Sequence, residues 1–234
     1  MRKLAFALAA VALFVAPASA QQQQAMRPPA TEAPLFDGVA LIGPPPAAGS
    51  AALGADILAM HPTVSAERLA QARADQPFGP WVAMQPVLGA DFTEARFPRT
   101  ARVFADVLAA IGPPLDATKR QWQRRRPFLD MQNVTQCDAP SDALAASGSY
   151  PSGHAAGGWS WALVMAELIP SRGDALLQRG RDYGDSRVIC GFHYPSDVAA
   201  GRTIAAAAMA RLHADPAFRR DMEAARRELA RVYH

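Results

Sequence analysis

The chain has 234 residues, of which 50% are hydrophobic and 19% charged, and its formal net charge is +3. This balance is typical of one globular domain with a sizeable core and argues against two domains. The small net charge excludes a nucleic-acid-binding protein of the basic kind.

The N-terminus has the three parts of a secretory signal peptide. The charged pair Arg2-Lys3 precedes an apolar run over residues 4–15, and Ala18-Ser19-Ala20 is a small-residue cleavage site. The apolar run is shorter than the about 20 residues that cross a bilayer, and the later apolar stretches are interrupted by charges. We therefore expect residues 1–20 to be removed near Ala20, and the protein to be periplasmic without stable membrane insertion.

The rest of the chain predicts an all-α fold, a single-domain helical bundle over residues 51–234. Residues 21–50 are rich in glutamine and proline and predict an extended N-terminal arm or a loop lying on the domain. From residue 51 onward apolar residues recur at helical spacing, and breakers such as Gly112-Pro113-Pro114 separate the helices. The predicted helices cover residues 52–60, 64–74, 79–89, 93–111, 115–125, 154–169, 172–190, 196–213 and 216–232.

A cluster of cations at residues 119–126 is the first candidate for chemistry. Lys119 and Arg126 are seven residues apart, which is two helical turns, so both would lie on one helix face and could bind one anion together. Pro127 would end that helix. Read alone, the cluster is equally a solvated basic face. The other arginines lie off the shared face and are predicted to be surface charges: Arg120, Arg124 and Arg125.

The stretch 148–154, Gly-Ser-Tyr-Pro-Ser-Gly-His, is the second candidate, because it ends a polar loop and opens an apolar helix. Ser152 can cap the helix, and Gly153 lets backbone N–H groups approach a ligand closely. Free amides and the helix dipole attract an oxyanion there, and His154 would stand beside it. An ordinary capped helix with a surface histidine is the alternative.

His193 and Asp197 form the third candidate. They are four residues apart and Pro195 is placed to start a helix, so the carboxylate can reach back to the imidazole. A carboxylate on one ring nitrogen fixes the tautomer and leaves the other lone pair outward. His193 is therefore the candidate nucleophile and His154 the candidate acid, unless the pair is only an ion pair at a helix end. A divalent metal is disfavoured because the surrounding cations would repel it.

The chain has two cysteines, Cys137 and Cys190. An even count in an exported protein favours a disulfide between them over two buried thiols.

The motifs Lys-x6-Arg-Pro, Pro-Ser-Gly-His and Ser-Arg-x5-His-x3-Asp occur in this order along the chain. Together they resemble the signature of the type-2 phosphatidic acid phosphatase superfamily, which includes the vanadium haloperoxidases. The closer resemblance is to the bacterial class A nonspecific acid phosphatases, and it rests on the signal peptide and on residues 44–50, 148–154 and 186–191. It covers about residues 41–230, with Ala155 standing where many members have threonine.

This resemblance implies an acid phosphatase, a homodimer with no cofactor and no metal, that hydrolyses phosphomonoesters. His193 would attack phosphorus to form a phosphohistidine, Asp197 would hold His193, and His154 would protonate the leaving alcohol and later activate water. The phosphoryl oxygens would be bound by Lys119, Arg126, Ser152, Gly153 and Arg187.

The same resemblance implies small phosphorylated substrates such as nucleotides, sugar phosphates or aryl phosphates, and allows a phosphotransferase side activity. Because His154 must be protonated to act as an acid, we expect an acidic pH optimum. Tyr150, Trp122 and the N-terminal arm are candidates to line the entrance, and each is equally compatible with a core or surface position. Three alternatives remain open: a vanadate-dependent haloperoxidase-like enzyme, a lipid phosphatase, and a periplasmic phosphate-binding protein without turnover.

Overall fold

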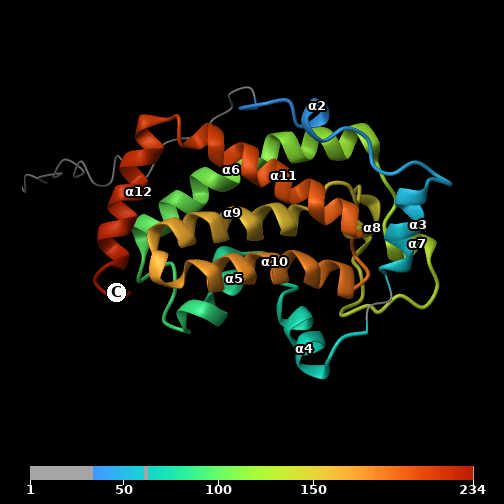
Figure 1. Cartoon of the computed structure of the whole chain (residues 1–234), viewed down its shortest axis with the longest axis horizontal. Helices are drawn as coiled ribbons and strands as arrows, with labels where there is room; N and C mark the ends of the chain where they lie inside the picture. Colours follow the sequence, from blue (N-terminus) through green and yellow to red (C-terminus); the bar gives the residue numbers. More distant parts are fainter. Residues whose placement is uncertain (1–33, 61–62, 234) are drawn as a thin grey trace, which may run out of the picture. The chain divides into compact units, whose positions relative to one another are not determined.

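Three helices of the C-terminal half lie side by side at the centre of the fold, with α9 (Gly153–Leu168) between α10 (Gly173–Ile189) and α11 (Pro195–Leu212) (Figure 1). The computed structural model describes residues 34–60 and 63–233, so the predicted signal peptide and residues 21–33 of the arm lie outside the described residues. Within the described ranges every regular element is a helix. The predicted all-α class is therefore confirmed.

Short connections make these three central helices run antiparallel to their neighbours. The one-turn helix η1 (Pro170–Arg172) joins α9 to α10, and a few residues join α10 to α11. Small residues allow close packing: a Cβ at Gly180 of α10 would clash with Ala162 of α9, and one at Gly201 of α11 would clash with the Ser152 carbonyl. This close approach brings the N-terminal ends of α9 and α11 next to the C-terminal end of α10.

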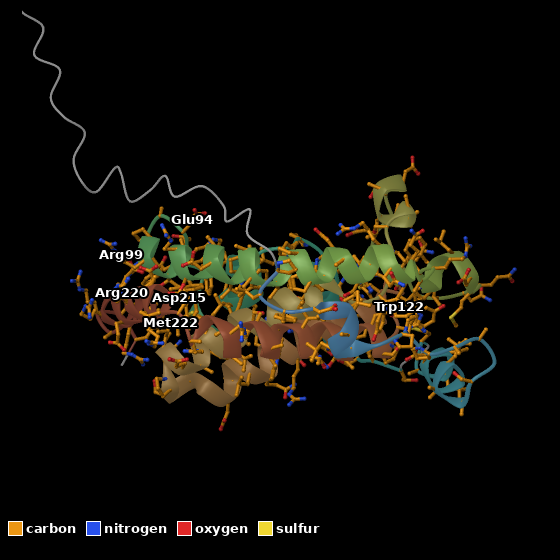
Figure 2. The ribbon with its side chains drawn as sticks, turned by 90° about the horizontal axis from the view of Figure 1, so that it is seen from above. Glu94, Arg99, Trp122, Asp215, Arg220 and Met222 are labelled. Carbon is orange, nitrogen blue, oxygen red and sulfur yellow. A yellow bond between two sulfur atoms is a disulfide. The ribbon has the colours of Figure 1, made fainter. Side chains whose placement is uncertain are left out.

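The remaining helices surround this centre. α12 packs on the start of α6, where the Glu228 carboxylate accepts from the backbone N–H groups of Arg99 and Thr100. Figure 2 shows Arg99 near the first turn of α6 and Trp122 at the opposite end of that helix. The elements are α2 (Gly38–Ile42), α3 (Ala51–Leu58), α4 (Ala66–Ala74), α5 (Pro80–Leu88), α6 (Pro98–Trp122), α7 (Pro127–Asp130), α8 (Asp142–Ala146) and α12 (Pro216–Leu229).

Helix α6 corrects the prediction of two helices over residues 93–111 and 115–125. It is one helix of 25 residues that contains Pro113 and Pro114. An interior proline costs a helix about 3 kcal/mol because it removes a hydrogen bond and crowds the preceding turn. Ile111 and Leu115, on either side of the prolines, are buried in the core. Their packing stabilises a continuous helix across Pro113 and Pro114, where the sequence pattern predicts a break.

Part of the predicted arm is also helical, because residues 38–42 form α2. The Asp37 carboxylate caps this helix by accepting from the N–H groups of Val39 and Ala40. Gly38 lies directly on α6, where a Cβ would come within 2.8 Å of the Pro114 carbonyl oxygen. The described end of the arm is therefore packed on the domain.

A disulfide joins Cys137 to Cys190, as the sequence predicts. Cys137 lies in the segment between α7 and α8, and Cys190 directly follows α10. The bond ties this long connection to the end of α10. Along the described part of the chain, no helix is both long enough and apolar enough to cross a membrane.

Candidate active site

The predicted site residues gather where four helix ends meet, at the end of α6 that Trp122 marks in Figure 2. Lys119 lies in the last turn of α6, and Arg187 in the last turn of α10. His154 lies in the first turn of α9, and Asp197 in the first turn of α11. The Ser152 N–H donates to the Asp197 carbonyl over 2.9 Å, which ties the starts of α9 and α11 together.

His193 is 3% exposed and both of its ring nitrogens have partners. Its Nδ1 lies 3.4 Å from Oδ2 of Asp197, and its Nε2 lies 3.2 Å from Nη1 of Arg126. A guanidinium can only donate, so Nε2 must be the acceptor and the ring proton must be on Nδ1, facing the carboxylate. The Nε2 lone pair of His193 therefore points toward Arg126.

Burial and nearby charge hold this pair in one protonation state. Burial lowers the pKa of His193 well below its ordinary value, against the raising effect of the hydrogen bond with Asp197. Burial would raise the pKa of Asp197, but its hydrogen bond with His193 and the charge of Arg124 bring that pKa below its ordinary value. Both effects favour a neutral imidazole next to a carboxylate.

Arg124 is not the surface charge that helical spacing predicts. Its side chain is 9% exposed and bridges two carboxylates, with Nη1 2.7 Å from Oδ1 of Asp197 and Nη2 2.8 Å from Oδ2 of Asp56. The guanidinium also lies 3.9 Å from the ring centroid of Tyr194. The prediction is wrong because α6 ends at Trp122 and the next residue is left-handed, so helical register no longer applies.

Lys119 and Arg126 do meet, but not through a shared helix face. Arg126 has extended backbone at the start of α7, and Pro127 begins this helix rather than ending α6. The two side chains converge on one backbone oxygen: Lys119 Nζ donates to the Gly148 carbonyl over 2.6 Å, and Arg126 Nη2 over 3.3 Å. Their common position therefore comes from the loop before α9.

The end of α8 and the residues that follow it also fix the orientation of Arg126. Its Nε donates to the carbonyls of Leu144 and Ser147, and Nη2 donates to the Ser147 hydroxyl. Burial, followed by repulsion from Arg126, lowers the pKa of Lys119 to about 7. Burial lowers the pKa of Arg126 to about 10, so it stays charged.

Gln76 connects His154 to Arg187, and no sequence motif pointed to it. Its carbonyl lies 3.1 Å from Nε2 of His154, and its side-chain oxygen accepts from Nη1 of Arg187. A carbonyl can only accept, so Nε2 of His154 carries a proton and Nδ1 is the nitrogen left for other partners. Burial, and then the charge of Arg187, lowers the pKa of His154 to about 3.

Arg187 is buried, and its Nε has no hydrogen-bond partner among the described residues. A buried donor without an acceptor raises the free energy of the folded protein, and a charged donor raises it more. A bound anion would supply the missing acceptor. Its guanidinium lies 4.4 Å from the ring centroid of Phe192. Burial lowers its pKa to about 10, so the positive charge persists at neutral pH.

Two serines lie at or just before the start of α9 and have different partners. Ser152 is the N-cap and its hydroxyl accepts from the Ala155 N–H over 3.3 Å, while Gly153 is the first residue of the helix. The Ser149 hydroxyl, which the sequence analysis did not single out, donates to Oδ2 of Asp197 and lies 3.3 Å from Nδ1 of His193. Ser149 therefore shares the carboxylate oxygen that faces the imidazole.

The donors of the site suit an anion. Lys119, Arg126 and Arg187 bring positive charge, and Asp197 is already bound to Arg124. Over residues 34–60 and 63–233, no three histidine, cysteine or carboxylate side chains gather as a cation site. Of the two positions open to Tyr150, the structure has the core one, because the residue is buried and its hydroxyl donates to the Ile42 carbonyl.

Comparisons with known proteins point to one family. The profile of the PAP2 superfamily matches residues 103–221. A non-specific acid phosphatase of Providencia stuartii is 36% identical over 206 residues, which cover 84% of this chain and 82% of that protein. An acid phosphatase of Zymomonas mobilis is 42% identical over 144 residues, covering 62% of this chain and 54% of that protein. A non-specific acid phosphatase of Salmonella typhimurium is 40% identical over 145 residues, 62% of this chain and 58% of its own length.

Proposed function

This chain belongs to the PAP2 superfamily, and on that premise we propose that it is an exported acid phosphatase that hydrolyses phosphomonoesters through a phosphohistidine, without a metal. The observation that carries the proposal is the orientation of His193. Its Nδ1 faces Asp197 and its unprotonated Nε2 faces Arg126, inside a buried group of cations. A periplasmic homodimer is part of the same proposal, and rests on residues 1–20 and on the resemblance to class A enzymes.

In the first step, Nε2 of His193 attacks phosphorus and the bond from phosphorus to the leaving oxygen breaks. The imidazole becomes positive, and Asp197 stabilises that charge through Nδ1–H. His154 gives its Nδ1 proton to the leaving oxygen while Nε2–H stays on the Gln76 carbonyl. In the second step, His154 takes a proton from water, the oxygen of that water attacks phosphorus, and His193 leaves with its lone pair restored.

The cations supply the stabilisation that phosphoryl transfer needs. Because the transition state of phosphoryl transfer is loose, the protein contributes mainly by positioning the phosphoryl group and by stabilising its negative charge. The charges of Lys119 and Arg126 act on both His193 and His154, and the charge of Arg187 acts on His154. The Gly153 N–H adds the positive end of the α9 dipole. A phosphoryl oxygen would also give the unpaired Nε of Arg187 an acceptor.

We expect the wild-type protein to hydrolyse p-nitrophenyl phosphate in excess EDTA at a rate within about twofold of the rate without it, because no step is assigned to a metal. Release of p-nitrophenolate measures this directly. A loss of activity in EDTA that Mg²⁺ or Zn²⁺ restores would contradict the metal-free proposal. Bromide oxidation by the vanadate-loaded protein, in place of hydrolysis, would favour the haloperoxidase alternative instead.

We expect the rate to be highest at acidic pH. Burial and Arg187 lower the pKa of His154 to about 3, so the ring is neutral above that pH. A bound phosphoryl dianion balances the charges of Arg187, Arg126 and Lys119, which raises the pKa of His154 and allows it to hold the proton it must donate. As pH rises past this higher pKa, kcat should fall. The pH profile of kcat measures it, and a maximum above about pH 8 would contradict the role of His154.

A substitution of His154 provides the control for that profile. His154→Gln should slow the hydrolysis of an alkyl phosphate much more than that of p-nitrophenyl phosphate, because p-nitrophenolate leaves without needing a proton. Equal losses on both substrates would mean that His154 positions the phosphoryl group instead of protonating the leaving group.

A further inference from the structure

Phe78 is a large apolar side chain left half in solvent beside the proposed acid. It lies in the short connection between α4 and α5 and is 50% exposed. Its ring centroid is 5.1 Å from that of His154, with the two planes at 67°. An exposed aromatic ring in contact with a partly buried histidine is a feature that the phosphoryl chemistry described above does not use.

The backbone on both sides of Phe78 is anchored. The Tyr183 hydroxyl donates to the Pro77 carbonyl over 2.7 Å and accepts from the Gly79 N–H over 3.3 Å. On the N-terminal side, the Gln76 side-chain amide donates to the Ala72 carbonyl over 2.7 Å. Phe78 is therefore presented by a fixed segment, even though its ring is exposed.

The ring itself rests on the first turns of α9. Its centroid lies 5.1 Å from that of Trp161, and a Cβ at Gly157 would come within 2.9 Å of its Cε2 atom. Any larger residue at position 157 would push the ring away. The absence of a side chain there allows one side of the ring to lie on the helix while the other stays in solvent.

Two aromatic rings from the described part of the chain pack against His154, and they differ in exposure. Tyr183 stacks on the imidazole with centroids 5.6 Å apart and is fully buried. Phe78 approaches it edge-on and is half exposed. A ligand group that lies on the solvent side of His154 can therefore contact Phe78, whereas Tyr183 is out of its reach.

We propose that Phe78 is a specificity-determining residue that packs against the ring of an aromatic leaving group, so that the site prefers aryl phosphates to alkyl phosphates. The inference rests on the proposed function, in which His154 protonates the leaving oxygen. In an aryl phosphate the ring is bonded directly to that oxygen, so it lies within van der Waals reach of a side chain touching His154. Aromatic pairs gain from offset or edge-to-face packing as well as from buried area, and an alkyl group has no such face.

The test compares phenyl phosphate with glycerol 2-phosphate in the wild type, Phe78→Leu and Phe78→Tyr. In Phe78→Leu, kcat/KM for phenyl phosphate should fall by roughly tenfold while that for glycerol 2-phosphate stays within about twofold. Phe78→Tyr keeps the ring and should keep the wild-type preference. Leu58→Ala removes an apolar side chain that is 83% exposed and should change neither value.

The possible results separate this inference from the proposed function. If the wild type hydrolyses neither ester, the phosphatase proposal itself fails. If it hydrolyses both, and Phe78→Leu lowers both equally or neither, then the ring only supports His154 or does nothing, and the inference is overturned.

A second measurement needs no variant. Phenylphosphonate should inhibit the wild type roughly tenfold more strongly than methylphosphonate, because only the first carries a ring next to the phosphoryl group. Equal inhibition constants would overturn the inference while leaving the proposed phosphatase activity intact.

Discussion

His193→Ala is expected to lose phosphomonoester hydrolysis, with kcat at least about 10³-fold lower, because the variant has no lone pair to attack phosphorus. The cations would remain, so phosphate should still bind. The measurement is p-nitrophenyl phosphate hydrolysis at saturating substrate, together with alkaline quenching of the wild type to trap a phosphorylated histidine. Alkali-stable phosphate on His193 of the wild type, absent from the variant, is the expected result.

The matched control is His213→Ala, which removes a histidine at the exposed end of α11. Its side chain is 37% exposed and its Nε2 lies 3.1 Å from a carboxylate oxygen of Glu167. This variant should keep kcat within about twofold. If His193→Ala and His213→Ala were equally active, the nucleophile would have to be another group, and the whole assignment of the site would fail.

Arg124→Ala is expected to lower the free energy of unfolding by about 3–5 kcal/mol, because it leaves two buried carboxylates without their counter-charge. Asp56 is 5% exposed and Asp197 is fully buried, and Arg124 is the cation that binds both. Without Arg124, the pKa of Asp197 should rise toward the value that burial favours, and kcat should fall too. Urea unfolding with the disulfide intact measures the stability.

The neighbouring residue gives the control for this prediction. Arg125 pairs with Asp130 over 2.6 Å, but both side chains are exposed. Solvent screens such a pair, so Arg125→Ala should cost less than about 1 kcal/mol. Equal losses for the two variants would mean that the bridge from Asp56 through Arg124 to Asp197 contributes no more than an exposed ion pair.

The sequence predicts the parts of this site that follow from local spacing. His193 and Asp197 are one helical turn apart with Pro195 at N1, and the capped start of α9 at Ser152 depends on neighbouring residues alone. The same local reasoning fails for Pro113 and Pro114, because their cost to the helix is offset by burial that only the tertiary structure provides.

Local spacing also fails where partners are distant in sequence. Asp56 and Arg124 are 68 residues apart, and Gln76 and His154 are 78 apart, with no repeated pattern connecting either pair. Their contacts depend on how α3 and the segment after α4 pack against the central helices. Arg124 is expected at the surface because the predicted helix continues past Trp122. The helix ends there instead, and the left-handed residue Gln123 changes the direction in which Arg124 points.

The Gly148 carbonyl has a consequence for how a substrate enters. This oxygen accepts from both Lys119 and Arg126, at 2.6 Å from Nζ of the first and 3.3 Å from Nη2 of the second. The backbone dipole of this carbonyl therefore reduces the repulsion between the two positive charges. A phosphoryl oxygen reaching these cations offers the same kind of acceptor with a full negative charge. In the proposed reaction a phosphoryl oxygen would replace this carbonyl as the acceptor, and little else would have to move because Leu144 and Ser147 already orient Arg126.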